Sequence, residues 1–335
     1  MSDSNFESEL KNTPDLSVNI AGVRLKNPVI AASGTFGFGK EYSEFFDISL
    51  LGGICTKGLT ITPRKGNEGI RIWETPSGLL NSIGLENPGI GSFLENELPY
   101  LKRLRTVIIA NLSGATSDEY INGAELLNKS SVDMIELNIS CPNLKAGGMA
   151  FGLDPGTAAA LVAAVRRVCT DKPLVVKLSP NAPSVASVAL SCVNAGADAL
   201  SLVNTFKAMA IDTVNRKPVF DNITAGLSGP SIKPIALRII WELFDTLEEA
   251  KLQIPIIGIG GISCAEDALE FLMAGACAVQ VGSANLVNPH SMPVIIDGIN
   301  EYMQNNLILK TGSLLIKRKE HGKNNKSSKG IGSLA

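Results

Sequence analysis

The chain has 335 residues, of which 45% are hydrophobic and 19% charged, a composition typical of a globular protein and not of a disordered one. Thirty lysines and arginines against 32 aspartates and glutamates leave a formal net charge of −2, which gives no general electrostatic reason to bind nucleic acid or an anionic membrane. This charge balance favours a small-molecule partner, and no apolar run is long enough to span a bilayer.

The two ends of the chain differ from its middle. The first residues, MSDSNFESELK, are acidic where a secretory signal is basic and then apolar, so we expect no signal peptide and a disordered leader over residues 1–16. From residue 310 to 335 the sequence is basic and low in complexity, and we expect a solvated tail in preference to a nucleic-acid-binding arm. Six scattered cysteines without a CxxC pair provide no local metal site and fit a reducing cytoplasm.

Between these ends, residues 17–309, short runs rich in Val, Ile and Leu recur, each followed by glycine or small polar residues and then by a segment of helical period. Runs this apolar suit parallel strands covered on both faces, and eight such units predict an α/β fold, a closed (β/α)8 TIM barrel. The expected strand cores are 28–32, 53–57, 106–110, 134–138, 174–178, 199–203, 256–259 and 278–281. We expect residues 16–26 to form a small hairpin at the bottom of the barrel.

Capping residues mark the expected helices. Asp154 followed by Pro155 predicts a helix start, because an aspartate accepts from free N–H groups and proline suits the first turn. Ser263 and Glu266 have the spacing of a capping box, and Gly275 is placed to end the helix that they begin.

Two glycine-rich turns follow the last two expected strands, Gly258–Gly261 and the pair Gly282 and Ser283. Barrels bind phosphate at this place through bare backbone N–H groups. Tight strand-to-helix turns explain single glycines equally well, but their occurrence after two consecutive strands favours a phosphate-bearing ligand.

Lys57 and Lys177 each end an apolar strand, where an unpaired ammonium would be costly to bury. We expect each to face an anionic or electron-rich ligand; pairing with a barrel carboxylate such as Glu136 is the alternative. Asparagines in similar places can donate and accept hydrogen bonds at once, as the edge of a heterocycle requires, although such amides also cap turns. These asparagines are Asn81, Asn111, Asn138 and Asn204.

Cys141 differs from the other cysteines, which the pattern places in strands, helices or a first turn as small buried side chains. It opens a glycine-containing loop, CPNLKAGGMAFG, directly after the fourth expected strand, where a mobile lid would cover the barrel mouth. A thiol is a workable base near neutral pH. No histidine lies near it in sequence, so a Cys–His nucleophile pair is not supported.

These segments resemble the dihydroorotate dehydrogenases, and among them the catalytic subunits of the NAD-linked group, class 1B. The resemblance covers roughly residues 17–305. It rests on KNPVIAASGTFGFGKEY, LNSIGLENPG, IELNISCPNLKAGGMAFG, VKLSPN, LVNT, GLSGPSIKPIALR, GIGGI and VGSANL, of which ELNISCPN followed by GGMAFG is the most specific.

The resemblance implies FMN on the barrel mouth and a pyrimidine substrate above it. The implied FMN contacts are Ser33, Lys57, Gly58, Asn111, Asn138, Lys177, Val203, Gly229, Gly260, Gly261, Gly282 and Ser283. The implied pyrimidine contacts are Lys57, Asn81, Ser82, Ile83, Gly84, Leu85, Asn138, Asn204 and Thr205. Cys141 would take the proton from C5 of dihydroorotate while hydride leaves C6 for the flavin, giving orotate for UMP biosynthesis. Lys177 would stabilise the negative charge that reduction places on the flavin.

The resemblance also implies the remaining partners. In the NAD-linked group, a homodimer of catalytic chains joins two subunits that carry FAD and an iron–sulfur cluster and pass electrons to NAD. This chain has neither a cysteine cluster nor a dinucleotide fingerprint, which agrees with that division of labour. The quinone-using, membrane-bound relatives carry a serine base and an N-terminal helical extension, so we expect a cytoplasmic enzyme without a metal of its own.

Two other classes remain as alternatives. A dihydropyrimidine dehydrogenase chain has a similar lid cysteine, but tends to have histidine where Asn143 stands and cluster cysteines near its end. A phosphate-binding barrel isomerase or lyase without flavin would explain the glycine turns but not the asparagines together with Cys141. A pure scaffold would leave the strand-end lysines unexplained.

Overall fold

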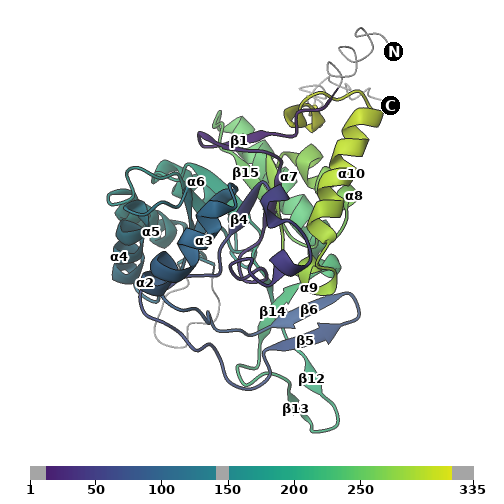
Figure 1. Ribbon diagram of the computed structural model, residues 1–335. Coiled ribbons are helices and arrows are strands. Elements are labelled where there is room, and N and C mark those ends of the chain that lie inside the picture. Colours follow the sequence, from purple (N-terminus) through teal and green to yellow (C-terminus); the bar gives the residue numbers. More distant parts are fainter. Residues whose placement is uncertain (1–12, 141–150, 319–335) are drawn as a thin grey trace, which may run out of the picture.

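The computed structural model describes residues 13–140 and 151–318, and its centre is a closed parallel β-barrel (Figure 1). All eight expected strand cores are confirmed as barrel strands. Each strand pairs with the next along the chain and the last pairs with the first, which closes the ring. The strands are β3 (Val29–Ala31), β4 (Gly53–Cys55), β7 (Val107–Leu112), β8 (Met134–Asn138), β9 (Leu174–Lys177), β10 (Ala199–Leu202), β15 (Ile256–Ile259) and β16 (Ala278–Val281).

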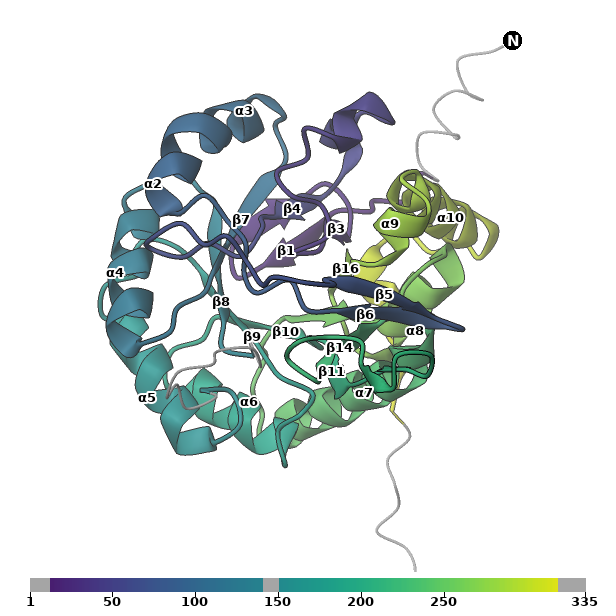
Figure 2. The same cartoon turned by 90° about the horizontal axis from the view of Figure 1, so that it is seen from below.

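Helices surround this ring, as the view along the barrel shows (Figure 2). They are α2 (Ile90–Ser92), α3 (Leu98–Arg103), α4 (Ser117–Asn128), α5 (Pro155–Arg166), α6 (Val185–Asn194), α7 (Lys233–Glu249), α8 (Ala265–Ala274), α9 (Ala284–Val287) and α10 (Ser291–Asn305). Between β3 and β4 the chain forms two short 3₁₀ turns, Tyr42–Glu44 and Ile48–Leu50, in place of an α-helix.

The caps of α5 and α8 test the expected helix starts. Asp154 is the N-cap of α5 and accepts a hydrogen bond from the backbone N–H of Thr157, as predicted. The capping box of α8 lies one residue later than predicted, on Cys264 and Asp267, because the carboxylate of Asp267 and not that of Glu266 reaches back to the N-cap N–H. Gly275 ends α8 at φ +122°, a conformation that favours glycine.

The expected hairpin is present as β1 (Val18–Ile20) and β2 (Val23–Leu25), paired antiparallel. Ile20 and Leu25 are fully buried against the inward side chains at one end of the barrel. The hairpin therefore plugs the end of the barrel opposite to β5 and β6 (Figure 1).

An antiparallel sheet that the sequence did not predict lies across the other end of the barrel (Figure 2). It is inserted after β4 and after β10, in the order β11–β14–β6–β5. Its strands are β5 (Ile72–Thr75), β6 (Gly78–Asn81), β11 (Phe206–Ala208) and β14 (Ala225–Ser228), and a small hairpin, β12 (Ile211–Asp212) with β13 (Lys217–Pro218), projects beyond it. This sheet forms one wall above the carboxyl ends of the barrel strands.

The folded part of the chain extends beyond the expected limits of 17 and 309. Asp15 pairs with Lys310 in an isolated β-bridge, and residues Thr311–Leu314 form a 3₁₀ turn with Leu314 buried. Arg318 donates to Asp245 and stacks over the Trp241 ring at 3.4 Å, which fixes this segment on α7. The first part of the tail that we expected to be solvated, residues 310–318, is therefore packed on the folded chain. Residues 1–12 and 319–335 lie outside the described residues.

Candidate functional site

A cavity of about 490 Å³ opens at the carboxyl ends of the barrel strands, beneath the added sheet. Most of the predicted site residues line it, which brings together segments from seven of the eight strand ends. From the predicted set, the lining contains Ser33, Lys57, Gly58, Asn81, Ile83, Gly84, Leu85, Asn138, Lys177, Val203, Asn204, Thr205, Gly229, Gly260, Gly261, Gly282 and Ser283.

Two predicted residues do not line this cavity. Ser82 is buried behind it, where its hydroxyl oxygen accepts hydrogen bonds from Asn67 and Asn222. Asn111 lies fully buried one layer below Gly58, inside the barrel. Neither side chain is therefore placed to contact a ligand in the cavity.

Other lining residues were missed because they lie away from strict strand ends. Thr35, Phe36 and Tyr42 belong to the loop after β3, and Leu79 and Ser228 to the added sheet. The available signal was the segment SGTFGFGKEY, in which an aromatic and glycine-rich stretch directly follows a buried strand.

Lys177 forms the floor of the cavity and is paired with a buried carboxylate. Its side chain is 6% exposed, and its Nζ lies 3.8 Å from Oε1 of Glu136, which is fully buried. The two hypotheses for this lysine are therefore both realised, since it meets a barrel carboxylate and also faces the cavity. At 3.8 Å this contact is an ion pair without a hydrogen bond, so the ammonium retains N–H donors for a ligand.

Four neutral groups hold the Glu136 carboxylate in the centre of the barrel. Burial alone would raise the pKa of this carboxyl, but the Lys177 charge and hydrogen bonds from Gln280, Ser201 and Cys55 outweigh it, so the pKa lies below its usual value. Asn111 also donates to Oε1, at 2.7 Å. Burial and the negative Glu136 raise the pKa of the Cys55 thiol well above its usual range, so Cys55 is a neutral donor. Glu136 is thus an anion within the barrel.

Lys57 is held at the side of the cavity by an acidic neighbour. Its Nζ lies 3.9 Å from Oε2 of Glu86, and the same carboxylate oxygen accepts from Arg71 at 2.8 Å. Both lysines lie at the carboxyl ends of their strands, with the Lys57 side chain 28% exposed. The cavity therefore has two cationic groups, one at its floor and one at its edge.

A chain of hydrogen bonds fixes the amides on the far side of the cavity. Asn204 donates to the hydroxyl of Ser140 at 2.6 Å, and Ser140 donates to Oδ1 of Asn138 at 2.8 Å. Tyr120 donates to the backbone oxygen of Asn138. Cys141, the predicted base, follows Ser140 directly in sequence and lies outside the described residues.

The first predicted phosphate turn, at Gly260 and Gly261, lies close to the backbone at Gly229. Gly260 and Gly261 have φ of +136° and +73°, and a Cβ on Gly261 would lie 2.7 Å from the backbone oxygen of Gly229. Gly258, which we expected in the turn, lies inside β15 and packs on Phe271. Bare backbone at Gly229, Gly260 and Gly261 therefore lines one side of the cavity, as anion binding requires.

Two polar atoms without a partner lie buried behind the cavity wall at Gly58. Oδ1 of Asn111 and Oγ of Ser113 are buried without a hydrogen-bond partner among the described residues. A Cβ added at Gly58, which lines the cavity, would lie 3.1 Å from Oδ1 of Asn111 and 3.5 Å from Oγ of Ser113. A buried ammonium and bare glycine turns together match the electron-rich edge and the phosphate of FMN.

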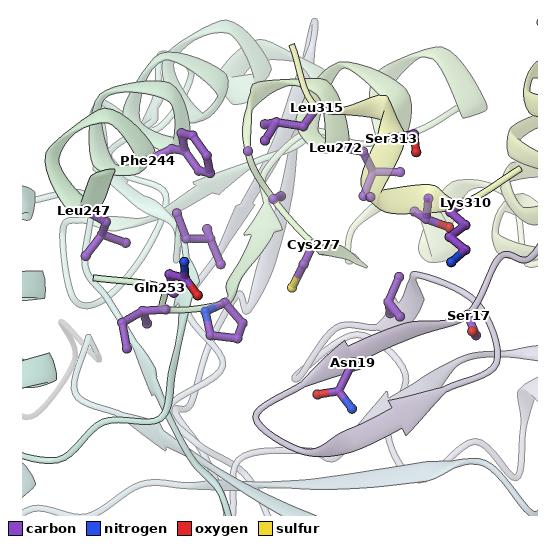
Figure 3. A pocket seen from close by; sticks show the side chains of 18 of the residues that line it. Ser17, Asn19, Phe244, Leu247, Gln253, Leu272, Cys277, Lys310, Ser313 and Leu315 are labelled. Carbon is purple, nitrogen blue, oxygen red and sulfur yellow. The ribbon is translucent and has the colours of Figure 1, made fainter. Parts of the chain in front are cut away.

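A second cavity, of about 770 Å³, lies at the opposite end of the barrel (Figure 3). Side chains from the β1–β2 hairpin, from α7 and from the segment after α10 surround it, including Asn19, Phe244, Leu247 and Lys310. Burial raises the pKa of Cys277 in its wall to about 12, so this thiol is not a nucleophile. This end of a barrel serves stability, so we place the candidate active site in the smaller cavity.

The fold and the cavity at the carboxyl ends of the strands define the class of protein, a barrel enzyme. That cavity has a cationic floor, walls lined with amides and an anion site made of bare backbone. Within the described residues, no cluster of His, Cys, Asp and Glu could hold a metal ion, and no helix is long and apolar enough to cross a membrane.

Comparison with known proteins identifies the family. The family model for dihydroorotate dehydrogenase matches residues 15–303. A dihydroorotate dehydrogenase B (NAD(+)) catalytic subunit from Petrotoga mobilis is 60% identical over 290 residues, 87% of this chain and 95% of that protein. The protein of the same description from Geotalea daltonii is 53% identical over 294 residues, 88% of this chain and 94% of that protein. The chain belongs to the dihydroorotate dehydrogenase family, which implies a flavoprotein oxidoreductase.

Proposed function

We propose that this chain is the catalytic subunit of an NAD-linked dihydroorotate dehydrogenase and oxidises dihydroorotate to orotate in pyrimidine biosynthesis. The observation that carries the proposal is the buried Lys177 ammonium on the floor of a cavity whose walls include Asn138 and Asn204. Family membership and relatives that are 53% to 60% identical support the same activity. We propose FMN as this flavin, and the bare backbone of the glycine turns is suited to bind its phosphate group.

In this proposal the chain holds both the cofactor and the substrate. Lys177 binds the electron-rich side of the flavin, and Gly229, Gly260, Gly261, Gly282 and Ser283 bind its phosphate. The amides of Asn81, Asn138 and Asn204 pair with the pyrimidine edge, and Lys57 attracts its negative charge. When bound, FMN supplies the acceptor for the hydride from C6 of the substrate.

Cys141 is the proposed base for the proton on C5. The C5–H bond leaves its electron pair to form the ring double bond, the C6–H bond leaves as hydride, and the proton is held on Sγ of Cys141 until solvent removes it. Cys141 follows Ser140, whose hydroxyl bonds to both Asn138 and Asn204, so the base would lie at the end of the segment that positions the substrate amides.

The further partners are also proposals. Because the relatives are described as catalytic subunits, we propose a second subunit that carries the electrons onward and holds FAD and an iron–sulfur cluster. Two catalytic chains forming a homodimer, each with one such subunit, would make a heterotetramer in the cytoplasm. We propose no metal for this chain.

Anaerobic flavin reduction tests the function directly. Purified chain reconstituted with FMN should be yellow and should lose its absorption when dihydroorotate is added. A preparation that stays colourless with FMN refutes the flavin proposal and favours a phosphate-binding isomerase or lyase. Bleaching by dihydrouracil but not by dihydroorotate would favour a dihydropyrimidine dehydrogenase instead.

Cys141→Ala tests the base. The variant should bind FMN normally and should be reduced by dihydroorotate about 10²-fold or more slowly, the usual loss when a general base is removed. Cys264→Ala, which removes a partly exposed thiol at the start of α8, is the matched control and should reduce at the wild-type rate. Near-normal reduction of Cys141→Ala would exclude Cys141 as the base.

A further inference from the structure

Glu136 lies at the point where the barrel strands and the candidate cofactor site meet. It is on β8, fully buried, and the groups that contact its carboxylate come from five other strands. These groups are Cys55 on β4, Asn111 on β7, Lys177 on β9, Ser201 on β10 and Gln280 on β16. Glu136 and Lys177 are two of three charged side chains that are buried in the described part of the chain; the third, Asp267, caps α8.

The contacts of Glu136 are asymmetric in a way that orients Asn111. Because Nδ2 of Asn111 donates to Oε1 of Glu136, the other end of the amide, Oδ1, points away from the carboxylate and has no partner among the described residues. That oxygen lies beneath Gly58 on the cavity wall. A neutral partner in place of the carboxylate could accept from or donate to the amide, so the orientation of Asn111 would no longer be unique.

The same carboxylate acts on Lys177 through charge. An ammonium that is 6% exposed exerts a strong field on any ligand above it, and an anion 3.8 Å from its Nζ offsets part of that field. The positive potential at the cavity floor is therefore weaker than an isolated lysine would produce, because Glu136 cancels part of it.

We propose that Glu136 is a positioning residue for the flavin: it orients the Asn111 amide and offsets the Lys177 charge, and so sets how much more tightly the site binds reduced flavin than oxidised flavin. The inference rests on the proposed function, because it needs a flavin in this cavity. Nothing in it requires Glu136 to touch the cofactor, since the carboxylate acts through Lys177 and Asn111.

Glu136→Gln is the decisive variant because it keeps the shape of the side chain and removes its charge. Reduction by two electrons adds negative charge to the flavin, so a lysine without its anion should favour the reduced form. We expect the affinity ratio of reduced to oxidised FMN to rise about tenfold or more, which is about 30 mV in the midpoint potential for each factor of ten. The readouts are the dissociation constant of oxidised FMN and the potential of bound relative to free flavin.

Two variants separate charge from structure. Glu136→Asp retains the anion, so the affinity ratio should stay within about threefold of wild type even where both affinities fall. Ser201→Ala removes one neutral donor to the same carboxylate and should also leave the ratio unchanged. A purely structural Glu136 would weaken both flavin forms alike in Glu136→Gln, and an unchanged ratio in that variant overturns the inference.

A second comparison applies where Glu136→Gln alone does not fold because it leaves the Lys177 ammonium buried and unpaired, since a double variant without either charge avoids that cost. Lys177→Met leaves Glu136 as the only charge of the pair, whereas Lys177→Met with Glu136→Gln leaves none. The affinity ratio of the single variant should fall below that of the double variant as the pH rises and Glu136 ionises. Identical ratios from about pH 5.5 to about pH 9 overturn the inference.

These outcomes are distinct from failure of the proposed function. A wild-type chain that binds no FMN overturns both proposals. A wild-type chain that binds FMN and is bleached by dihydroorotate, with Glu136 variants of unchanged ratio, overturns only the role of Glu136.

Discussion

Lys177→Met should destabilise the flavin-free protein in a way that depends on pH. In the wild type, the lowered pKa of Glu136 means that its stabilising contribution is present above the ordinary glutamate pKa and is lost only as the pH falls through the lowered value. Without Lys177, burial is no longer outweighed by an opposite charge, and the Glu136 pKa should rise above that of the unfolded chain. The unfolding free energy of the variant should therefore decrease as the pH rises toward the raised pKa, whereas that of the wild type decreases as the pH falls through the lowered pKa.

The size of the effect follows from the burial of the pair. Glu136 is fully buried and Lys177 is 6% exposed, so removing the lysine leaves an uncompensated charge inside the barrel. Such a loss costs about 3–5 kcal/mol of unfolding free energy at pH 8. The loss should shrink by about 1.4 kcal/mol for each pH unit below the raised pKa, because protonated Glu136 needs no partner.

Urea unfolding of flavin-free protein at about pH 8 and about pH 5.5 measures both quantities. Lys102→Met is the matched control, since Lys102 forms a 3.1 Å ion pair with Asp133 at the surface. Exposed pairs contribute about 0–1 kcal/mol, so this variant should show a small loss. An equally large loss for Lys177→Met at both pH values would refute the assignment of Glu136 as the buried charge that Lys177 neutralises.

Three further variants test the plug, the phosphate turn and the chain after α10. Ile20→Ala empties a fully buried position in the hairpin and should lower the unfolding free energy by about 2–5 kcal/mol in urea. Gly261→Ala would bring a Cβ to 2.7 Å from the Gly229 oxygen at positive φ, so fluorescence titration should show FMN binding weakened about tenfold or more. Arg318→Ala should cost about 1–2 kcal/mol in the same urea assay, whereas Lys317→Ala, which is exposed, should cost almost nothing.

The barrel could be predicted because its strands are buried on both faces. A strand such as Leu174–Lys177 is apolar at consecutive positions, and this pattern is visible without knowledge of its neighbours. The added sheet has no such signal. Residues Ile72–Thr75 are mostly exposed, β12 and β13 have two residues each, and Asn81 pairs with Gly226, which is 145 residues away. Only the tertiary fold brings these strands together.

The sequence predicts which residues lie near the candidate site better than it predicts which way their side chains point. Placement after a parallel strand puts a residue at the carboxyl end of the barrel, and this located Asn138, Lys177 and Asn204. Adjacent residues in an extended chain point to opposite sides, so a sequence run such as 81–85 cannot show that Ser82 faces away from the cavity while Asn81 lines it. The network around Glu136 was also hidden, because its donors are 25 to 144 residues away in sequence.

The composition of the barrel interior explains why that network is present. Near the hairpin, the inward layer consists of apolar side chains such as Ile30, Ile109 and Val175, as is usual for such barrels. Nearer the candidate site, the interior holds Glu136 and its polar partners instead. An apolar layer of similar volume would be as stable or more stable, because desolvation of a buried ion pair cancels much of its attraction. Stability therefore does not account for this layer, whereas the proposed support of a buried ammonium and an oriented amide beneath FMN does.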